Sequence, residues 1–105
     1  MDNKKIYSLL GLSTRAGKLK SGEFSVLDAI RSGKAYAVIV SEDASDNTKK
    51  LFSNMCEFYE VPFAVFGSKE ELGHCIGKTY RASICILDEG FAKTVKDKIS
   101  LCMED

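Results

Sequence analysis

Two glycines and three cations stand immediately before a predicted helix, in the segment 14–23. A helix N-terminus carries unpaired N–H groups and the positive end of the helix dipole, so a phosphate could bind there beside Arg15, Lys18 and Lys20. Glu23 could accept a hydrogen bond from the amino group of a nucleic-acid base while the cations hold the backbone. The alternative is an ordinary capped helix start, in which Glu23 complements the dipole.

A second segment, residues 73–81, also joins glycines, cations and one aromatic residue. Loops of this composition can hold an unstacked base against an apolar or aromatic side chain. The alternative is a helix that ends at Gly77 and continues into an ordinary turn. His74, taken alone, is interpreted as a surface residue.

Acidic pairs follow two of the predicted strands, at Glu42-Asp43 and at Asp88-Glu89. Together they could approach a Mg²⁺ ion, as in a receiver-like phosphoacceptor site. However, the sequence has one histidine and neither a G-x-S-x-G nor a G-x-x-x-x-G-K-[ST] motif, so it supplies no nucleophile with a partnered base. The acids are more simply explained as helix caps and turn residues, and we expect no enzymatic activity.

The four cysteines form no C-x-x-C pair, and the single histidine cannot complete a zinc site of the usual spacing. Cys56 lies on an apolar helix stripe and Cys85 lies in an apolar run, where a free cysteine acts as a small hydrophobic residue. We therefore expect reduced, unreactive thiols and neither a metal nor a cofactor.

The apolar periodicity alternates along the chain between the helical and the extended pattern. It indicates helices at residues 3–14, 22–32, 45–60 and 91–101, and a capping box from Ser68 to Glu71 indicates one more helix start. Short apolar runs indicate strands at 35–40, 63–66 and 82–87, and Lys18-Leu19-Lys20 indicates an edge strand whose lysines face solvent. Strands that are apolar on both faces must be covered on both, which predicts an α/β fold, a three-layer α/β/α sandwich.

Composition indicates one soluble domain over residues 1–105, with 45% apolar and 29% charged content. Cations and acids balance at 15 each, so no global basic field indicates a nucleic-acid binder. The charge is nevertheless uneven, because residues 1–34 carry seven cations and three acids whereas residues 35–76 carry three and seven. Two solvated faces of opposite sign would give the same pattern. With neither a membrane-spanning run nor a signal peptide, the chain is predicted to be cytoplasmic and not to bind a membrane.

Several motifs follow one another in a fixed order: G-K-L-K-x-G before a helix, A-I-R-S-G-K, S-E-D-A-S, V-P-F, S-K-E-E-L-G, and I-G-K-x-x-R before the last strand. Over residues 9–93 this order resembles the small bacterial YlxQ-type proteins of the L7Ae/L30e ribosomal-protein superfamily. The resemblance implies an L30e-like sandwich with a mixed four-stranded sheet whose last strand runs antiparallel to the rest. That orientation would bring the 15–23 segment, the 41–44 turn and the 76–81 loop to one edge.

The same resemblance implies an activity and a partner. In relatives this edge binds kink-turns or similar internal loops of RNA with tandem G·A pairs, without catalysis and without a metal. Relatives that read kink-turns place Asn-Glu after the G-K-[IL]-K-x-G motif, and a Lys three residues after that Glu. Here Phe24, Ser25 and Asp28 stand at those positions, and neither Phe24 nor Asp28 can do what the Asn and the Lys do.

The implied interface uses cations for phosphates, Glu23 for a base edge and Ile76 for packing on an extruded base. The phosphate-binding residues would be Arg15, Lys18, Lys20, Lys78 and Arg81. The remaining candidate RNA-binding residues are Gly22, Phe24, Ser25, Asp28, Glu42 and Gly77.

The leading hypothesis is a non-catalytic, ribosomal-protein-like and ribosome-associated protein that recognises structured RNA, either ribosomal or otherwise kink-turn-like. The alternative is a protein-interaction module on the same fold that has lost specific RNA binding, which the missing Asn-Glu-Lys set favours. The third hypothesis is the enzyme with paired acids.

Overall fold

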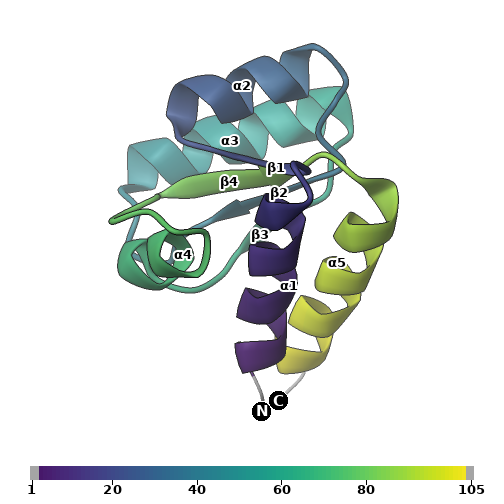
Figure 1. The fold of residues 1–105 in the computed structure, drawn as a ribbon. Helices are drawn as coiled ribbons and strands as arrows, with labels where there is room; N and C mark the ends of the chain where they lie inside the picture. The colour runs from purple at the N-terminus through teal and green to yellow at the C-terminus, as the bar shows by residue number, and fades with distance from the viewer. Residues whose placement is uncertain (1–2, 104–105) are drawn as a thin grey trace.

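The computed structural model describes residues 3–103, except for the side chains of residues 102 and 103. The elements of this part are α1 (Asn3–Arg15), β1 (Leu19–Ser21), α2 (Glu23–Arg31), β2 (Ala37–Val40), α3 (Asp46–Tyr59), β3 (Phe63–Val65), α4 (Lys69–Cys75), β4 (Ser83–Ile86) and α5 (Glu89–Met103). They follow the order that the apolar periodicity predicts (Figure 1). Among the described residues, no helix has both the length and the apolar character needed to cross a bilayer.

The strands form one sheet in the order β1-β4-β2-β3. β4 runs antiparallel to both of its neighbours, whereas β2 and β3 are parallel. This confirms the mixed four-stranded sheet and the antiparallel last strand. β1 is an outer strand, as the lysines around Leu19 predict, and both Lys18 and Lys20 are exposed.

Successive side chains of the central strands point to opposite faces of the sheet, and helices cover each face. Ile84 and Ile86 pack in one apolar cluster with residues of α1, α4 and α5. Val38 and Cys85 pack in a second cluster with residues of α2 and α3. The three-layer α/β/α sandwich is therefore confirmed, with α2 and α3 on one side of the sheet and the other three helices on the opposite side (Figure 1).

Polar caps fix where two of the helices start. The Ser68 hydroxyl accepts a hydrogen bond from the N–H of Glu71 at 3.0 Å, and the Glu71 carboxylate accepts one from the N–H of Ser68 at 3.2 Å. This reciprocal pair confirms the predicted capping box. α5 begins earlier than residue 91, because the Asp88 carboxylate accepts a hydrogen bond from the N–H of Phe91 at 2.9 Å and caps the helix.

The described thiols are those of Cys56, Cys75 and Cys85, and all three are free. Cys56 and Cys85 are buried in the core that α2 and α3 cover, and Cys75 is half-buried. Burial raises the pKa of each thiol to about 11, so each stays protonated at neutral pH. The fourth cysteine, Cys102, lies outside the described side chains.

Candidate nucleic-acid interface

Three loops meet at one edge of the sheet because β4 runs opposite to the other strands. The N–H of Gly22, after β1, donates to the carbonyl of Ser83 at 3.0 Å. On the other side of β4, the N–H of Ser41 donates to the carbonyl of Ala82 at 2.9 Å. Residues 21–25, 41–43 and 76–82 are hereafter called the convergent edge. The predicted meeting of the three loops is confirmed where these hydrogen bonds join them, at Gly22, Ser41 and the start of β4.

Arg81 connects the two basic segments directly. Its Nε donates to the hydroxyl of Ser21 at 3.0 Å, and one of its terminal nitrogens donates to the carbonyl of Tyr80 at 2.6 Å. Its backbone N–H donates to the carbonyl of Lys69 in α4 at 3.0 Å. The guanidinium is thus held in a fixed orientation between the end of β1 and the start of β4, which keeps a positive charge at the convergent edge.

The start of α2 exposes backbone donors at this edge. Gly22 occupies the N-cap position with φ 95° and supplies no side-chain cap, so the first N–H groups of α2 lack an intrahelical partner. Glu23, Phe24 and Ser25 of the first turn are exposed, and Phe24 is 83% exposed. Asp28 is also exposed and lies one turn beyond Phe24 on the same helix face. This end of α2 therefore combines the positive helix dipole with an exposed aromatic ring.

The loop that follows α4 is packed closely against that helix. A Cβ atom built on Gly73 would lie 2.7 Å from the carbonyl oxygen of Thr79 and 2.9 Å from the Cα of Tyr80. Gly77 has φ 79°, and the N–H of Lys78 donates to the carbonyl of Gly73 at 2.8 Å. The loop can therefore follow this path only because residue 73 has no side chain. The side chains of Lys78 and Tyr80 remain exposed.

Ile76 does not lie where the sequence suggested. Its side chain is 5% exposed and packs in the cluster that also contains Leu72. The prediction that it packs on an extruded base is wrong for this structure, because the core already surrounds it. The exposed apolar group of this loop is the ring of Tyr80, which is 57% exposed. The only sequence signal for Tyr80 was an aromatic residue among the glycines and cations.

Lys18 lies at the opposite end of β1 from the convergent edge. Its carbonyl accepts a hydrogen bond at 2.7 Å from the N–H of Leu87, which follows β4, whereas Gly22 pairs with Ser83 at the start of β4. The prediction that the whole 15–23 segment reaches the convergent edge is therefore wrong for Lys18. Lys20 lies between the two ends, opposite Cys85 in the register of β1 and β4.

Arg15 belongs to the last turn of α1, before the turn that leads into β1. One of its terminal nitrogens would lie 3.8 Å from a Cβ built on Gly11, so its side chain lies back along the helix. A cation there complements the negative end of the helix dipole. Arg15 is thus separated from the α2 start by the length of β1.

The two acidic pairs lie at opposite ends of the sheet. Glu42-Asp43 follows β2, Asp88-Glu89 follows β4, and these two strands are antiparallel. The idea that both pairs approach one Mg²⁺ ion is therefore wrong. Within the described residues, no group of three or more His, Cys, Asp or Glu side chains is arranged to hold a metal ion.

Glu42 and Asp43 instead hold the turn between β3 and α4. The Glu42 carboxylate accepts a hydrogen bond from the N–H of Gly67 at 3.1 Å, and the Asp43 carboxylate accepts one from the N–H of Lys69 at 2.9 Å. Because the backbone of Lys69 in turn binds Arg81, these acids support the placement of the basic loop.

Comparison with known proteins identifies relatives over most of the chain. Two relatives are named "RNA-binding protein YlxQ". The one from Bacillus subtilis is 41% identical, and the alignment covers 88% of this chain and 92% of the relative. The one from Enterococcus faecium is 43% identical, and the alignment covers 93% of this chain and 94% of the relative. The "Large ribosomal subunit protein eL8" of Thermoplasma acidophilum is 30% identical, and the alignment covers 84% of this chain and 74% of that protein.

Solved structures share the fold. A Bacillus halodurans protein described as having unknown function superposes with a TM-score of 0.89 at 40% identity, covering 91% of this chain and 97% of that one. The "15.5kD RNA binding protein" of Giardia lamblia superposes with a TM-score of 0.80 at 23% identity, covering 94% and 88%. The model of the ribosomal protein L7Ae/L30e/S12e/Gadd45 family matches residues 4–96. The family match and the relatives, together with the mixed sheet, show that the chain belongs to the ribosomal protein L7Ae/L30e/S12e/Gadd45 family.

Proposed function

We propose that this chain binds structured RNA, of the kink-turn or a related internal-loop type, and acts without catalysis as a ribosome-associated protein. The observation that carries the proposal is the hydrogen bond from Arg81 to Ser21, which joins two glycine-bearing loops into one surface. Each loop alone could be an ordinary helix cap or turn. Joined, they support a shared surface to which Arg81, the exposed Lys78 and the open N–H groups of α2 would each contribute.

The chemistry of this surface suits an RNA loop. Cations and free backbone N–H groups bind phosphate oxygens without regard to sequence. Two exposed aromatic rings, Phe24 and Tyr80, can each stack on an unpaired base, which is how single-stranded parts of RNA are commonly bound. Glu23 can accept a hydrogen bond from a base amino group at the same helix start.

The names of the relatives support an RNA partner. Two relatives at more than 40% identity are named RNA-binding proteins, and a third is named a protein of the large ribosomal subunit. The first name supports RNA binding by this chain, and the third supports an association with the ribosome.

A second candidate function is a protein-interaction module. The observation that favours it is the exposed face of α2, where Phe24 lies one turn from Asp28. An exposed ring beside a carboxylate is a plausible contact for a protein, whereas a carboxylate repels phosphate. This candidate predicts that RNA binds weakly or not at all.

The test is a titration of a fluorescent kink-turn RNA with the protein over a series of salt concentrations. Lys78→Ala should weaken binding and lower the slope of log K against log salt by about 0.7–0.9, the value for one lost phosphate contact. Lys50→Ala is the matched control, because Lys50 is also exposed but lies on α3, outside the residues of the convergent edge. An unchanged slope in Lys78→Ala would remove the convergent edge as the RNA site, and no binding by the wild type would favour the protein-interaction module.

A further inference from the structure

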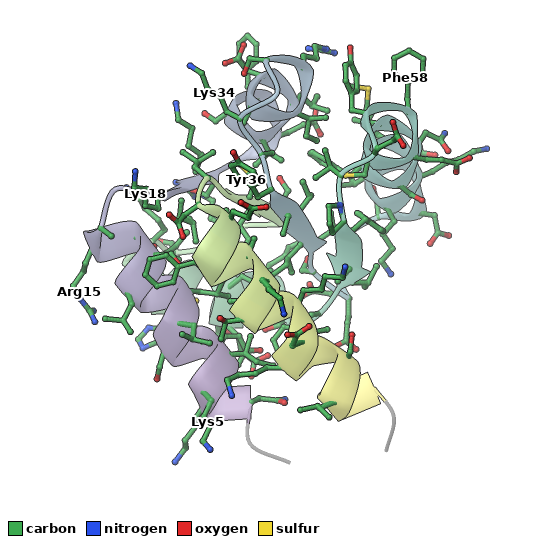
Figure 2. The ribbon with its side chains drawn as sticks, turned by 90° about the vertical axis from the view of Figure 1, so that its right-hand side faces the viewer. Lys5, Arg15, Lys18, Lys34, Tyr36 and Phe58 are labelled. Carbon is green, nitrogen blue, oxygen red and sulfur yellow. The ribbon has the colours of Figure 1, made fainter. Side chains whose placement is uncertain are left out.

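A row of exposed cations leads away from the convergent edge along the outer strand. Lys18 and Lys20 belong to or adjoin β1, which pairs only with β4 and leaves its other side open. Lys34 follows α2, and in Figure 2 Lys18 and Lys34 lie along the same side of the molecule. Lys18, Lys20 and Lys34 are hereafter called the β1-edge lysines.

Hydrogen bonds show how the far end of this row is built. The carbonyl of Lys18 accepts from the N–H of Leu87 at 2.7 Å, and the N–H of Tyr36 donates to the carbonyl of Ile86 at 2.8 Å. Lys18 and Tyr36 therefore flank the end of β4, and Lys34 stands two residues before Tyr36. The row thus begins beside Gly22 and ends at the opposite edge of the sheet.

The charges of this row are not neutralised within the described part of the chain. Among residues 3–103, the one ion pair within 4.0 Å joins Lys93 to Asp97 on α5. Glu23 and Asp28 on α2 are the nearest acids along the chain, and Asp88 directly follows Leu87, whose N–H binds the carbonyl of Lys18. None of these three carboxylates lies within 4.0 Å of the charged nitrogen of a β1-edge lysine. The β1-edge lysines therefore remain available to an anion.

We infer that the β1-edge lysines bind the phosphate backbone of a double-helical RNA stem that leaves the convergent edge. This inference rests on the proposed function and extends it, because it assigns a path to the RNA beyond the recognised loop. β1 advances about 3.3 Å per residue, so Ser21 and Lys18 are about 10 Å apart. Each strand of double-helical DNA carries one phosphate per about 3.4 Å of axis, and an RNA stem has a similar phosphate density, so this stretch faces about two or three phosphates of the stem.

Two RNAs with the same internal loop separate this inference from the proposed function. In one RNA both stems have about four base pairs, and in the other a single stem is lengthened to about twelve, which adds phosphates beyond the loop. Each stem is lengthened in turn. One of the two lengthened RNAs should bind about tenfold more tightly than the short one, and its salt slope should be steeper by about 1–2.

The double variant Lys18→Ala/Lys34→Ala should remove this gain and leave the binding of the short RNA unchanged. Lys78→Ala should instead weaken both RNAs, because it acts at the convergent edge. Lys50→Ala is again the control and should change neither. The inference is overturned if stem length has no effect on affinity, or if the double variant weakens the short and the long RNA equally.

One further outcome also overturns it. Lysines on an outer strand can serve only to prevent pairing with another sheet edge. In that case the double variant would self-associate in sedimentation experiments while binding the long RNA as tightly as the wild type. If the wild-type protein binds neither the short nor the long RNA, both the proposed function and this inference are wrong.

Discussion

Replacing Gly73 by alanine should displace the basic loop of the convergent edge. The added Cβ would lie 2.7 Å from the carbonyl oxygen of Thr79, 2.8 Å from its carbonyl carbon and 2.9 Å from the Cα of Tyr80. Non-bonded heavy atoms prefer about 3.5–4.0 Å, so the backbone must move by roughly 0.5–1 Å. Overpacking of this kind costs about 1–3 kcal/mol, and the helix propensity of alanine returns about 0.8–1.0 kcal/mol. We expect a net loss of about 1 kcal/mol in the free energy of unfolding.

The loop movement should also weaken RNA binding, because Arg81 follows the displaced residues directly. Losing one hydrogen bond between Arg81 and the RNA would cost about 1.5–3 kcal/mol of binding free energy, which lowers the affinity for RNA at least about tenfold. Urea unfolding measures the first effect, RNA titration measures the second, and amide chemical shifts of residues 78–81 report the movement.

Gly90→Ala provides the matched control for Gly73→Ala. Its Cβ would meet only the Asp88 carboxylate oxygen, at 3.2 Å. That oxygen caps α5, so the cost of weakening the cap by a small shift should offset the helix propensity that alanine gains. We expect a stability within about 0.5 kcal/mol of the wild type and unchanged RNA binding. The reasoning is refuted if Gly73→Ala gains stability like an unhindered helix alanine, or if the amide shifts of residues 78–81 stay in place.

Three further predictions concern stability and the thiols. Ser68→Ala should lower the free energy of unfolding by about 1 kcal/mol through loss of the capping box, and an unchanged urea midpoint would contradict this. Phe52→Ala should cost about 3–5 kcal/mol because the ring is fully buried, whereas Phe58→Ala, at 78% exposed, should cost under about 0.5 kcal/mol; equal losses would show that the core is misassigned. In the folded protein the three described thiols have pKa values of about 11, against 9.0 when unperturbed. Between about pH 9 and 11 the unfolded state therefore binds fewer protons than the folded state, so the free energy of unfolding should fall as the pH rises. Urea titrations across that pH range test this, and a stability that rises with pH would contradict it.

The elements of the fold were largely predictable because their signals are local. Short apolar runs specify buried strands, and Ser68 with Glu71 specifies a helix start in four residues. Two lysines around Leu19 were enough to indicate an outer strand. The early start of α5 was missed, because an aspartate before a helix is read equally well as a turn residue until its carboxylate is seen to accept the N–H of Phe91.

The site was predictable only in part, because its geometry depends on contacts between distant segments. The position of Lys18 is set by the register of β1 against β4, which nothing in residues 14–23 encodes. Ile76 is the C-cap of α4, and an isoleucine at the end of a helix can be either buried or exposed. It is covered because it packs with the core that α1, α4 and α5 form on the sheet. The link from Arg81 to Ser21 spans 60 positions and follows from the fold, not from either motif.

The most direct test of the central claim compares the binding of wild-type protein to an intact kink-turn RNA and to the same RNA with its G·A pairs disrupted. Phe24, Ser25 and Asp28 stand where the resemblance places Asn, Glu and Lys, and each good base contact is worth about 1–3 kcal/mol of discrimination. We therefore expect salt-dependent binding to both RNAs, with affinities within about tenfold of each other. We also expect that Phe24→Asn/Ser25→Glu/Asp28→Lys raises affinity and selectivity together. Absence of binding to either RNA would contradict the account at its centre. A wild-type preference of about a hundredfold for the intact kink-turn would show that another residue of the convergent edge reads the bases.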